Sequence, residues 1–315
     1  MSSLWEAAFI TSLLAGMLRM ATPILFAALG ELIAERAGIL NLGVEGMMLT
    51  GALTGFLVAH ATGSLWLGTV SALATGGLLG LFMAFMAAQL KVDQILVGLA
   101  LNLLAVGGTT YAYRLAFKDV GAKNPSTIAT FETLNIPLLS KIPFIGEVLF
   151  SQHLLTYIAL VLVPATYFLL YRTKYGLELR GIGDNPRAVD MRGINNIRRQ
   201  VLAVTFGGMM AGLGGAFLTL AATGLFVPEV SAGRGWIAIA VVIFGNWRPQ
   251  WILIGALLFG LVESIQLSLQ AVGVKVAHEF LLGLPYLLTI VALVFNRSRS
   301  QSPLALGIPY HRESR

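Results

Sequence analysis

The chain has 315 residues, of which 57% are hydrophobic and 11% are charged. Ordinary soluble domains contain about 25% charged residues, so this composition excludes a soluble protein and indicates a chain that lies in lipid. The basic residues behind the formal net charge of +6 stand in short segments between apolar stretches, which argues against a nucleic-acid partner, and the lack of cysteine excludes disulfides.

Nine apolar segments are candidates for membrane spans, because a helix needs about 20 apolar residues to cross the hydrocarbon core. They cover residues 7–30, 38–60, 65–89, 94–117, 152–171, 200–222, 232–245, 250–270 and 279–296. The sequence therefore predicts an all-α, polytopic membrane helix bundle that forms one transmembrane domain over residues 1–315. Segment 38–60 contains Asn41 and Glu45, and segment 232–245 is short, so we expect one or both to be broken or re-entrant helices.

Basic residues concentrate in the loop at 172–199 and in the tail at 297–315. Short loops rich in Lys and Arg stay in the cytoplasm, so both segments are expected inside the cell. The four candidate spans between them allow this, because an even number of crossings returns the chain to the same side. Counting back from the loop places residues 118–151 and the N-terminus outside. The first segment lacks the cleavage site of a secretory signal, so it should remain in the protein.

The loop at 172–199 contains the signals of a short helix. Asp184 or Asn185 can cap this helix, Pro186 suits its first position, and Gly193 suits the left-handed residue after its end. These residues predict a two-turn surface helix between two membrane spans. Such a helix could act as a lever between a soluble partner and the spans, or it could be a charged connector that only sets the topology.

Polar residues inside the apolar segments mark a candidate path for a solute. A charge at the bilayer centre costs about 2.5–3.5 kcal/mol on insertion scales, so Glu45 is expected to face protein or water. The glycines beside Glu45 weaken the helix, as in the interrupted helices that line polar sites in transporters. Two alternatives stay open: Glu45 could pair with Arg36 at the cytoplasmic interface, and Asn102 could join neighbouring helices rather than contact a ligand.

A second polar group surrounds the short segment at 232–245. Glu229 and Arg234 precede this segment and could form a gate at the outer mouth, or a solvated turn. Glu263 and Gln266 lie three residues apart, on one helical face that should point inward. Close helix packing is indicated by the small-residue pairs Gly51/Gly55, Gly76/Gly80 and Gly208/Gly212.

The sequence lacks the motifs of an enzyme. No G-x-x-x-x-G-K-[ST] phosphate loop occurs, so ATP-driven transport would need a separate nucleotide-binding subunit. No Ser-His-Asp or paired-carboxylate arrangement stands out. The four histidines are too dispersed to predict a metal site, and no cofactor is expected.

Three motifs in order resemble the permeases of the binding-protein-dependent ABC importer family that serves branched-chain amino acids, simple sugars and nucleosides. The first motif is NLGVEGMMLTGA at 41–52. The second combines YGLELR, GDNPRA and RGIN within 175–195, and the third combines AGRGWIAIA and VIFGNW within 232–247. The likeness extends over nearly the whole chain, and the Val44-Glu45-Gly46 form of the first motif is most similar to nucleoside permeases.

The resemblance implies a permease subunit of the bacterial inner membrane that moves nucleosides by alternating access. Its implied partners are a second, different permease, two ATPase subunits and an external solute-binding protein. The loop would form a coupling helix seated on the ATPase, through Asp184, Asn185, Pro186, Arg187, Ala188, Asp190, Arg192 and Gly193. The cargo would pass Asn41, Glu45 and Asn102.

Alternatives within the same family are a simple-sugar or a branched-chain amino acid permease. An alternative of another class is an ion-coupled secondary transporter, in which Glu45 and Glu263 would bind the coupling ion.

Overall fold

The computed structural model describes residues 2–117, 126–137, 140, 142, 144–271 and 301–310. Within these residues, seven helices are long and apolar enough to cross a membrane, which confirms the predicted polytopic helix bundle. They are α1 (Ser2–Arg36), α2 (Val44–Thr62), α3 (Leu65–Ala84), α4 (Gln94–Ala116), α6 (Leu154–Arg172), α9 (Asn196–Ala216) and α11 (Pro249–Ala271). Two π-helices, η1 (Phe85–Gln89) and η3 (Phe217–Thr223), extend α3 and α9. The span predicted at 279–296 lies outside the described residues.

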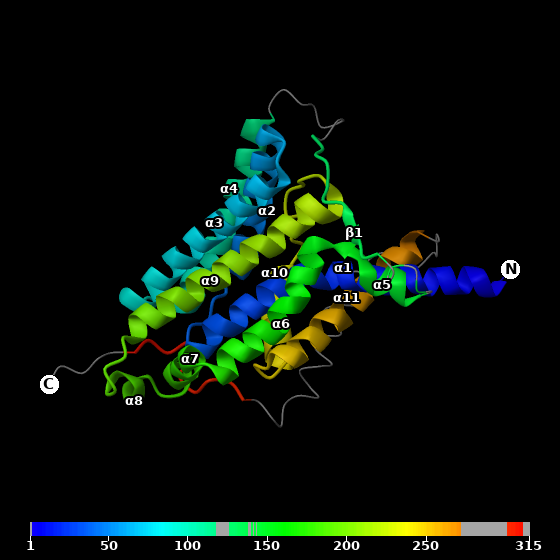
Figure 1. Ribbon diagram of the computed structural model, residues 1–315. Helices are drawn as coiled ribbons and strands as arrows, with labels where there is room; N and C mark the ends of the chain where they lie inside the picture. Colours follow the sequence, from blue (N-terminus) through cyan, green and yellow to red (C-terminus); the bar gives the residue numbers. More distant parts are fainter. Residues whose placement is uncertain are drawn as a thin grey trace.

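Helix α1 is the centre of the bundle and packs against α6, α9, α10 and α11 (Figure 1). Its apolar side chains Ile24, Phe26 and Leu32 are fully buried. The helix continues to Arg36, beyond the predicted end at residue 30. The extension is stable although it contains two acids, because both find partners: Glu31 accepts the backbone N–H of Asn41, and Glu35 accepts the indole N–H of Trp247.

The two ends of the bundle carry different short elements. Helices α7 (Lys174–Asp184) and α8 (Pro186–Asp190) lie at one end, beside residues 301–310, and we call this the α8 end (Figure 1). The opposite end carries α5 (Ile145–Phe150) and an antiparallel pair of strands, β1 (Thr133–Asn135) and β2 (Ser151–His153), in which Thr133 faces His153. The basic loop and the described part of the tail thus share one end, as predicted.

The second predicted span is helical only from Val44. After α1 ends, the chain reverses at Gly38, whose φ of +85° favours glycine, and runs back along α1 as far as Gly43. The backbone N–H of Asn41 reaches the Glu31 carboxylate at 2.9 Å, more than a turn before the end of α1. Helix α2 therefore starts inside the bundle, and we call residues 37–43 the re-entrant segment.

The short predicted span at 232–245 is also interrupted. Its helix, α10 (Arg234–Phe244), has 11 residues and therefore a length of about 16 Å, half of a hydrocarbon core of about 30 Å. The chain before it is not helical, and the backbone has positive φ at Glu229, Ala232 and Gly233. Helix α10 leads the chain to the α8 end, and at the corner that follows, the Trp247 carbonyl accepts a hydrogen bond from Arg36 at 2.9 Å.

Helices α2, α3 and α9 meet at a seam of glycines. A Cβ placed on Gly76 would lie 2.3 Å from the carbonyl oxygen of Gly208, and one on Gly51 would lie 2.5 Å from the Cα of Gly212. The helix backbones are therefore in direct contact, as small residues allow in membranes. The predicted packing role of these glycines is confirmed for the contacts of α9 with α3 and α2. In Figure 1, α3 and α9 lie side by side along their length.

Candidate functional site

A cavity of about 890 Å³ opens where the two interrupted helices meet. Its walls come from α2, α4, α10, α11 and the loop before α10. The lining residues are Glu45, Leu49, Leu99, Asn102, Leu103, Val106, Glu229, Ser231, Ala232, Gly233, Arg234, Trp236, Ile237, Glu263, Gln266 and Leu267. Four of the five predicted path and gate residues line this cavity. The fifth, Asn41, does not line the cavity and is fully buried in the re-entrant segment.

Glu45 joins the two interrupted helices. One carboxylate oxygen accepts hydrogen bonds from the Ser231 hydroxyl at 2.6 Å and the Gly233 N–H at 2.9 Å, and the other accepts from the Gly235 N–H at 2.6 Å. A helix N-terminus presents unpaired N–H groups and the positive end of the helix dipole, so a carboxylate is stabilising there. The alternative pairing of Glu45 with Arg36 is therefore wrong, because Glu45 caps α10.

Asn102 and Asn41 hold the re-entrant segment in place. The Asn102 side-chain oxygen accepts the N–H of Gly46 at 2.8 Å, and its side-chain nitrogen donates to the carbonyl of Leu42 at 2.7 Å. The Asn41 side-chain oxygen accepts the N–H of Gly43 at 3.1 Å. Both asparagines therefore satisfy backbone groups exposed by the break before α2, and Asn102 does what the helix-joining alternative predicted.

The gate residue Arg234 pairs with a carboxylate that the prediction did not assign to it. Its guanidinium lies 3.1 Å from Glu263 on α11 and also donates to the carbonyls of Val230 and Ser231. A cation in the first turn of a helix meets the positive end of the dipole, and the nearby carboxylates of Glu45 and Glu263 offset this cost. Glu229 and Arg234 both line the cavity, and their role as an outer gate stays a prediction.

Three polar or aromatic side chains of the cavity lack a hydrogen-bond partner in the described part of the chain. Among the described residues, no hydrogen-bond partner is found for the side chains of Glu229, Trp236 and Gln266, and Trp236 is 38% exposed. Gln266 lies on the inward face predicted from its spacing to Glu263. Trp236 was not singled out as a site residue, although it follows Gly235 directly within the third motif.

The loop at 172–199 contains a shorter capped helix than predicted. Helix α8 begins at Pro186, and the Asn185 side chain accepts the N–H of Ala188 at 3.1 Å, which confirms Asn185 and Pro186 in their predicted positions. The helix has five residues rather than two full turns. Gly193 has φ +79°, as predicted for the left-handed residue after the helix. Asp184 is not the cap and instead ends α7.

Helix α7 was not predicted. Thr173 caps it by accepting the N–H of Gly176 at 3.1 Å, and its apolar side chains Leu179 and Ile182 are buried against the bundle. The three-residue spacing of these two side chains, together with Thr173, is the signal that could have revealed α7. Asp184, the last residue of α7, is exposed beside Arg36, and the loop beyond α7 exposes Arg187, Ala188 and Arg192.

Comparisons with known proteins agree with this arrangement. The sequence profile of the family described as the branched-chain amino acid transport system permease component matches residues 13–293. The chain is 39% identical to TsgC13 of Haloferax volcanii, provisionally named a glucose ABC transporter permease, over 97% of this chain and 99% of that one. It is 33% identical to the guanosine ABC transporter permease NupQ of Bacillus subtilis, over 92% and 93% of the two chains.

It is also 33% identical to the nucleoside ABC transporter permease NupC of Lactococcus lactis, over 95% of this chain and 96% of that one. Each of these three organisms has a second, more distant ABC transporter permease relative, 24% to 28% identical. The profile match and these identities show that the chain belongs to the family of branched-chain amino acid transport system permease components, as a permease of an ABC importer.

Proposed function

We propose that this permease imports a neutral nucleoside across the inner membrane, driven by ATPase subunits that bind at the α8 end. The observation that carries the proposal is the cavity at the meeting point of the two interrupted helices. Interrupted helices are typical of transporter sites near the bilayer midplane. The α8 end would then face the cytoplasm, which agrees with the basic residues of the loop at 172–199.

The charges of the cavity favour a neutral cargo. Its ionisable lining residues are the acids Glu45, Glu229 and Glu263 and the single cation Arg234, which is already paired. An amino acid would bring a carboxylate that needs a cationic partner, so the branched-chain amino acid alternative is disfavoured despite the family's name.

A nucleoside suits the three side chains Glu229, Trp236 and Gln266. Trp236 offers a ring face on which a planar base can stack, an interaction worth about 1–3 kcal/mol per base. Gln266 supplies an amide that can both donate and accept, and Glu229 can accept hydrogen bonds from sugar hydroxyls. Two of the relatives are named for guanosine and nucleoside transport, which supports this cargo, whereas the relative named for glucose keeps a simple sugar as the second candidate.

A second permease would complete the cavity. Apolar side chains on its open side, Leu99, Leu103 and Leu267, are 41%, 76% and 50% exposed, so this side is not closed by the described part of the chain. Two permease relatives of unequal similarity occur in each of three organisms, which supports a partner of different sequence. An external solute-binding protein would deliver the cargo at the opposite end.

The assembly and the cargo can be tested together. The tagged protein would be purified from mildly solubilised membranes, its partners identified by mass spectrometry, and the co-purified binding protein screened against nucleosides, simple sugars and branched-chain amino acids. We expect an ATPase, a second permease and a nucleoside-binding protein. A binding protein that binds glucose and no nucleoside would refute the proposed cargo. Recovery of the chain alone would refute the proposed assembly.

The role of α8 can be tested by substitution. Arg187→Glu reverses an exposed charge, and Gly193→Pro cannot adopt the positive φ at that position, so both should abolish ATP-driven uptake while membrane insertion persists. Lys174→Glu makes the same charge reversal at an exposed residue of α7 and is the control, with uptake expected near the unmodified level. Normal uptake in both α8 variants would refute the coupling role.

A further inference from the structure

The tail residues 301–310, which we call the C-terminal strap, run across the α8 end of the bundle. The strap is hydrogen-bonded to four separate parts of the described chain. These contacts are Gln301 N–H to the Asn246 side chain at 2.6 Å, Ala305 N–H to Gly183 O at 2.8 Å, Gly307 N–H to Gly38 O at 3.2 Å, and Tyr310 hydroxyl to the Asp190 carboxylate at 3.3 Å. Arg248 also donates to the Gln301 side chain at 3.2 Å.

Each of these four contacts lies beside a break in a helix. Asn246 is at the corner after α10, Gly38 is in the re-entrant segment before α2, Gly183 is in the last turn of α7, and Asp190 ends α8. The strap therefore joins the proposed coupling helix to both interrupted helices that carry the cavity. These are the places where a small change of backbone angle can reorient a helix.

The chain is tightly packed around Gly183. A Cβ on this glycine would lie 2.5 Å from the carbonyl oxygen of Arg36 and 3.1 Å from the Cβ of Pro303. The end of α7, the end of α1 and the strap are thus in van der Waals contact at one point. A displacement of α7 and α8 must push on both neighbours, because close-packed groups transmit strain.

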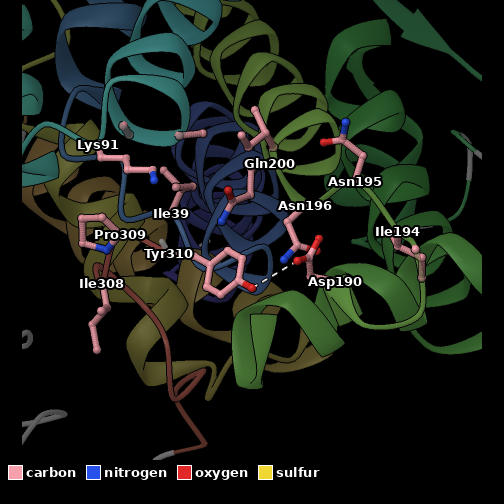
Figure 2. A pocket seen from close by; sticks show the side chains of 14 residues that line it. Ile39, Lys91, Asp190, Ile194, Asn195, Asn196, Gln200, Ile308, Pro309 and Tyr310 are labelled. Carbon is pink, nitrogen blue, oxygen red and sulfur yellow. Dashed lines mark hydrogen bonds between the residues drawn. The ribbon is translucent and has the colours of Figure 1, made fainter. Parts of the chain in front are cut away.

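The outer part of the strap is attached differently. A cavity of about 310 Å³ separates it from the bundle, with Ile308, Pro309 and Tyr310 on one wall and Ile39 and the start of α9 on the other. Figure 2 shows Tyr310 among the side chains that line this cavity, with its hydroxyl directed to Asp190. At this point the strap holds α8 through a polar link rather than through a packed apolar core.

We propose that the C-terminal strap is a positioning segment that transmits the displacement of α8 to the re-entrant segment and to α10. Movement of Asp190 pulls Tyr310, the strap shifts Gly38, and the re-entrant segment carries the shift to Glu45, which caps α10 at the cavity. The Asn246 contact holds the other end of α10 to the same strap. This inference rests on the proposed function, because it assumes that α8 receives the stroke of an ATPase.

The test uses the complete transporter in proteoliposomes, with both permeases, the ATPases and the loaded binding protein. Ala305→Pro removes the N–H that bonds Gly183, and Tyr310→Phe removes only the hydroxyl that bonds Asp190. The measured quantity is the number of nucleosides imported per ATP hydrolysed. We expect the double variant to lower this ratio by about fivefold or more, the factor that corresponds to the net value of one hydrogen bond.

A control variant and two further measurements distinguish a positioning role of the strap from an effect on folding. Leu304→Ala alters a strap residue that is 80% exposed and should leave the ratio unchanged. Basal ATPase activity and the amount of co-purified ATPase should equal those of the unmodified transporter in all variants.

An assembled double variant with an unchanged ratio would overturn the proposal. If the double variant fails to assemble, Tyr310→Phe alone decides, and an unchanged ratio in it also overturns the proposal. Absence of ATP-driven uptake in the unmodified transporter would instead refute the proposed function.

Discussion

The carboxylate of Glu45 makes the most exacting prediction, because three donors converge on it. In Glu45→Gln the shape is kept, but the side chain becomes neutral and one of its two oxygens is replaced by an NH₂ group. If this NH₂ faces Gly235, that backbone N–H loses its acceptor. If it faces the other way, the acceptor of Ser231 and Gly233 is lost. Either orientation leaves at least one donor at the start of α10 without a partner.

The cost can be worked out from these contacts. An unsatisfied buried donor costs about 1–3 kcal/mol, and the bonds that remain lose the extra strength of a charged acceptor. Loss of the favourable charge at a helix N-terminus adds about 0.3–1 kcal/mol. We therefore expect Glu45→Gln to destabilise the protein by about 2–4 kcal/mol, and Glu45→Ala, which removes all three bonds, by more.

Thermal inactivation of the solubilised transporter is the suitable assay, because unfolding of such assemblies is irreversible and the half-life is the operational measure. We expect Glu45→Gln to shorten the half-life at least about tenfold, the factor for 1.4 kcal/mol. Glu229→Gln makes the same chemical change on an exposed carboxylate of the same cavity and should leave the half-life nearly unchanged. Equal half-lives for the two variants would refute the capping role of Glu45.

Three further predictions concern packing, charge and pH. Gly215→Ala should lower the stability by about 1–3 kcal/mol through overpacking, because its Cβ would lie 1.8 Å from a carbonyl oxygen of α2. Gly107 has open space around it, so Gly107→Ala should be neutral or slightly stabilising. Thermal inactivation of the two variants is the comparison that checks this. Arg234→Leu or Glu263→Leu alone should lower the stability by about 3–5 kcal/mol, because each leaves a partly buried charge unpaired. The double variant should lose less stability than either single variant. Strictly additive losses would contradict the ion pair. The pKa of His153 lies below its usual 6.5, mainly because the side chain is buried. The stability that the neutral imidazole contributes should therefore be fully present above pH 6.5 and be lost as the pH falls below it. The loss should be smaller in His153→Gln.

The long membrane spans were predictable from the sequence where polar residues bound them. Helix α4 begins after the Asp93 cap and α6 ends at Arg172, each within two residues of the predicted bounds. The end of α1 was placed too early because Glu31 and Glu35 look like the polar boundary of a span. Their partners come from distant parts of the chain, so the hydropathy of the sequence cannot reveal that both acids are buried in a continuous helix.

The candidate site was predictable in part, where polar residues interrupt the apolar segments. Glu45 and Asn102 stand out as polar residues in apolar segments, and both lie at the cavity. The partner of Arg234 was not predictable, because it depends on how α10 packs against α11 and not on the sequence distance between the charges. Trp236 resembles any other aromatic residue in an apolar run, and only the structure shows that it lines the cavity and is partly exposed.

The glycine seam of α2, α3 and α9 also has a consequence for movement. Where helices touch through their backbones, no side chains lie between them that could change rotamer and let one helix slide past another. These three helices should therefore move as one rigid slab during a transport cycle. The change of shape is then left to the half-length helix α10, the re-entrant segment and their connecting turns, so the seam acts as the fixed frame against which the cargo pathway opens and closes.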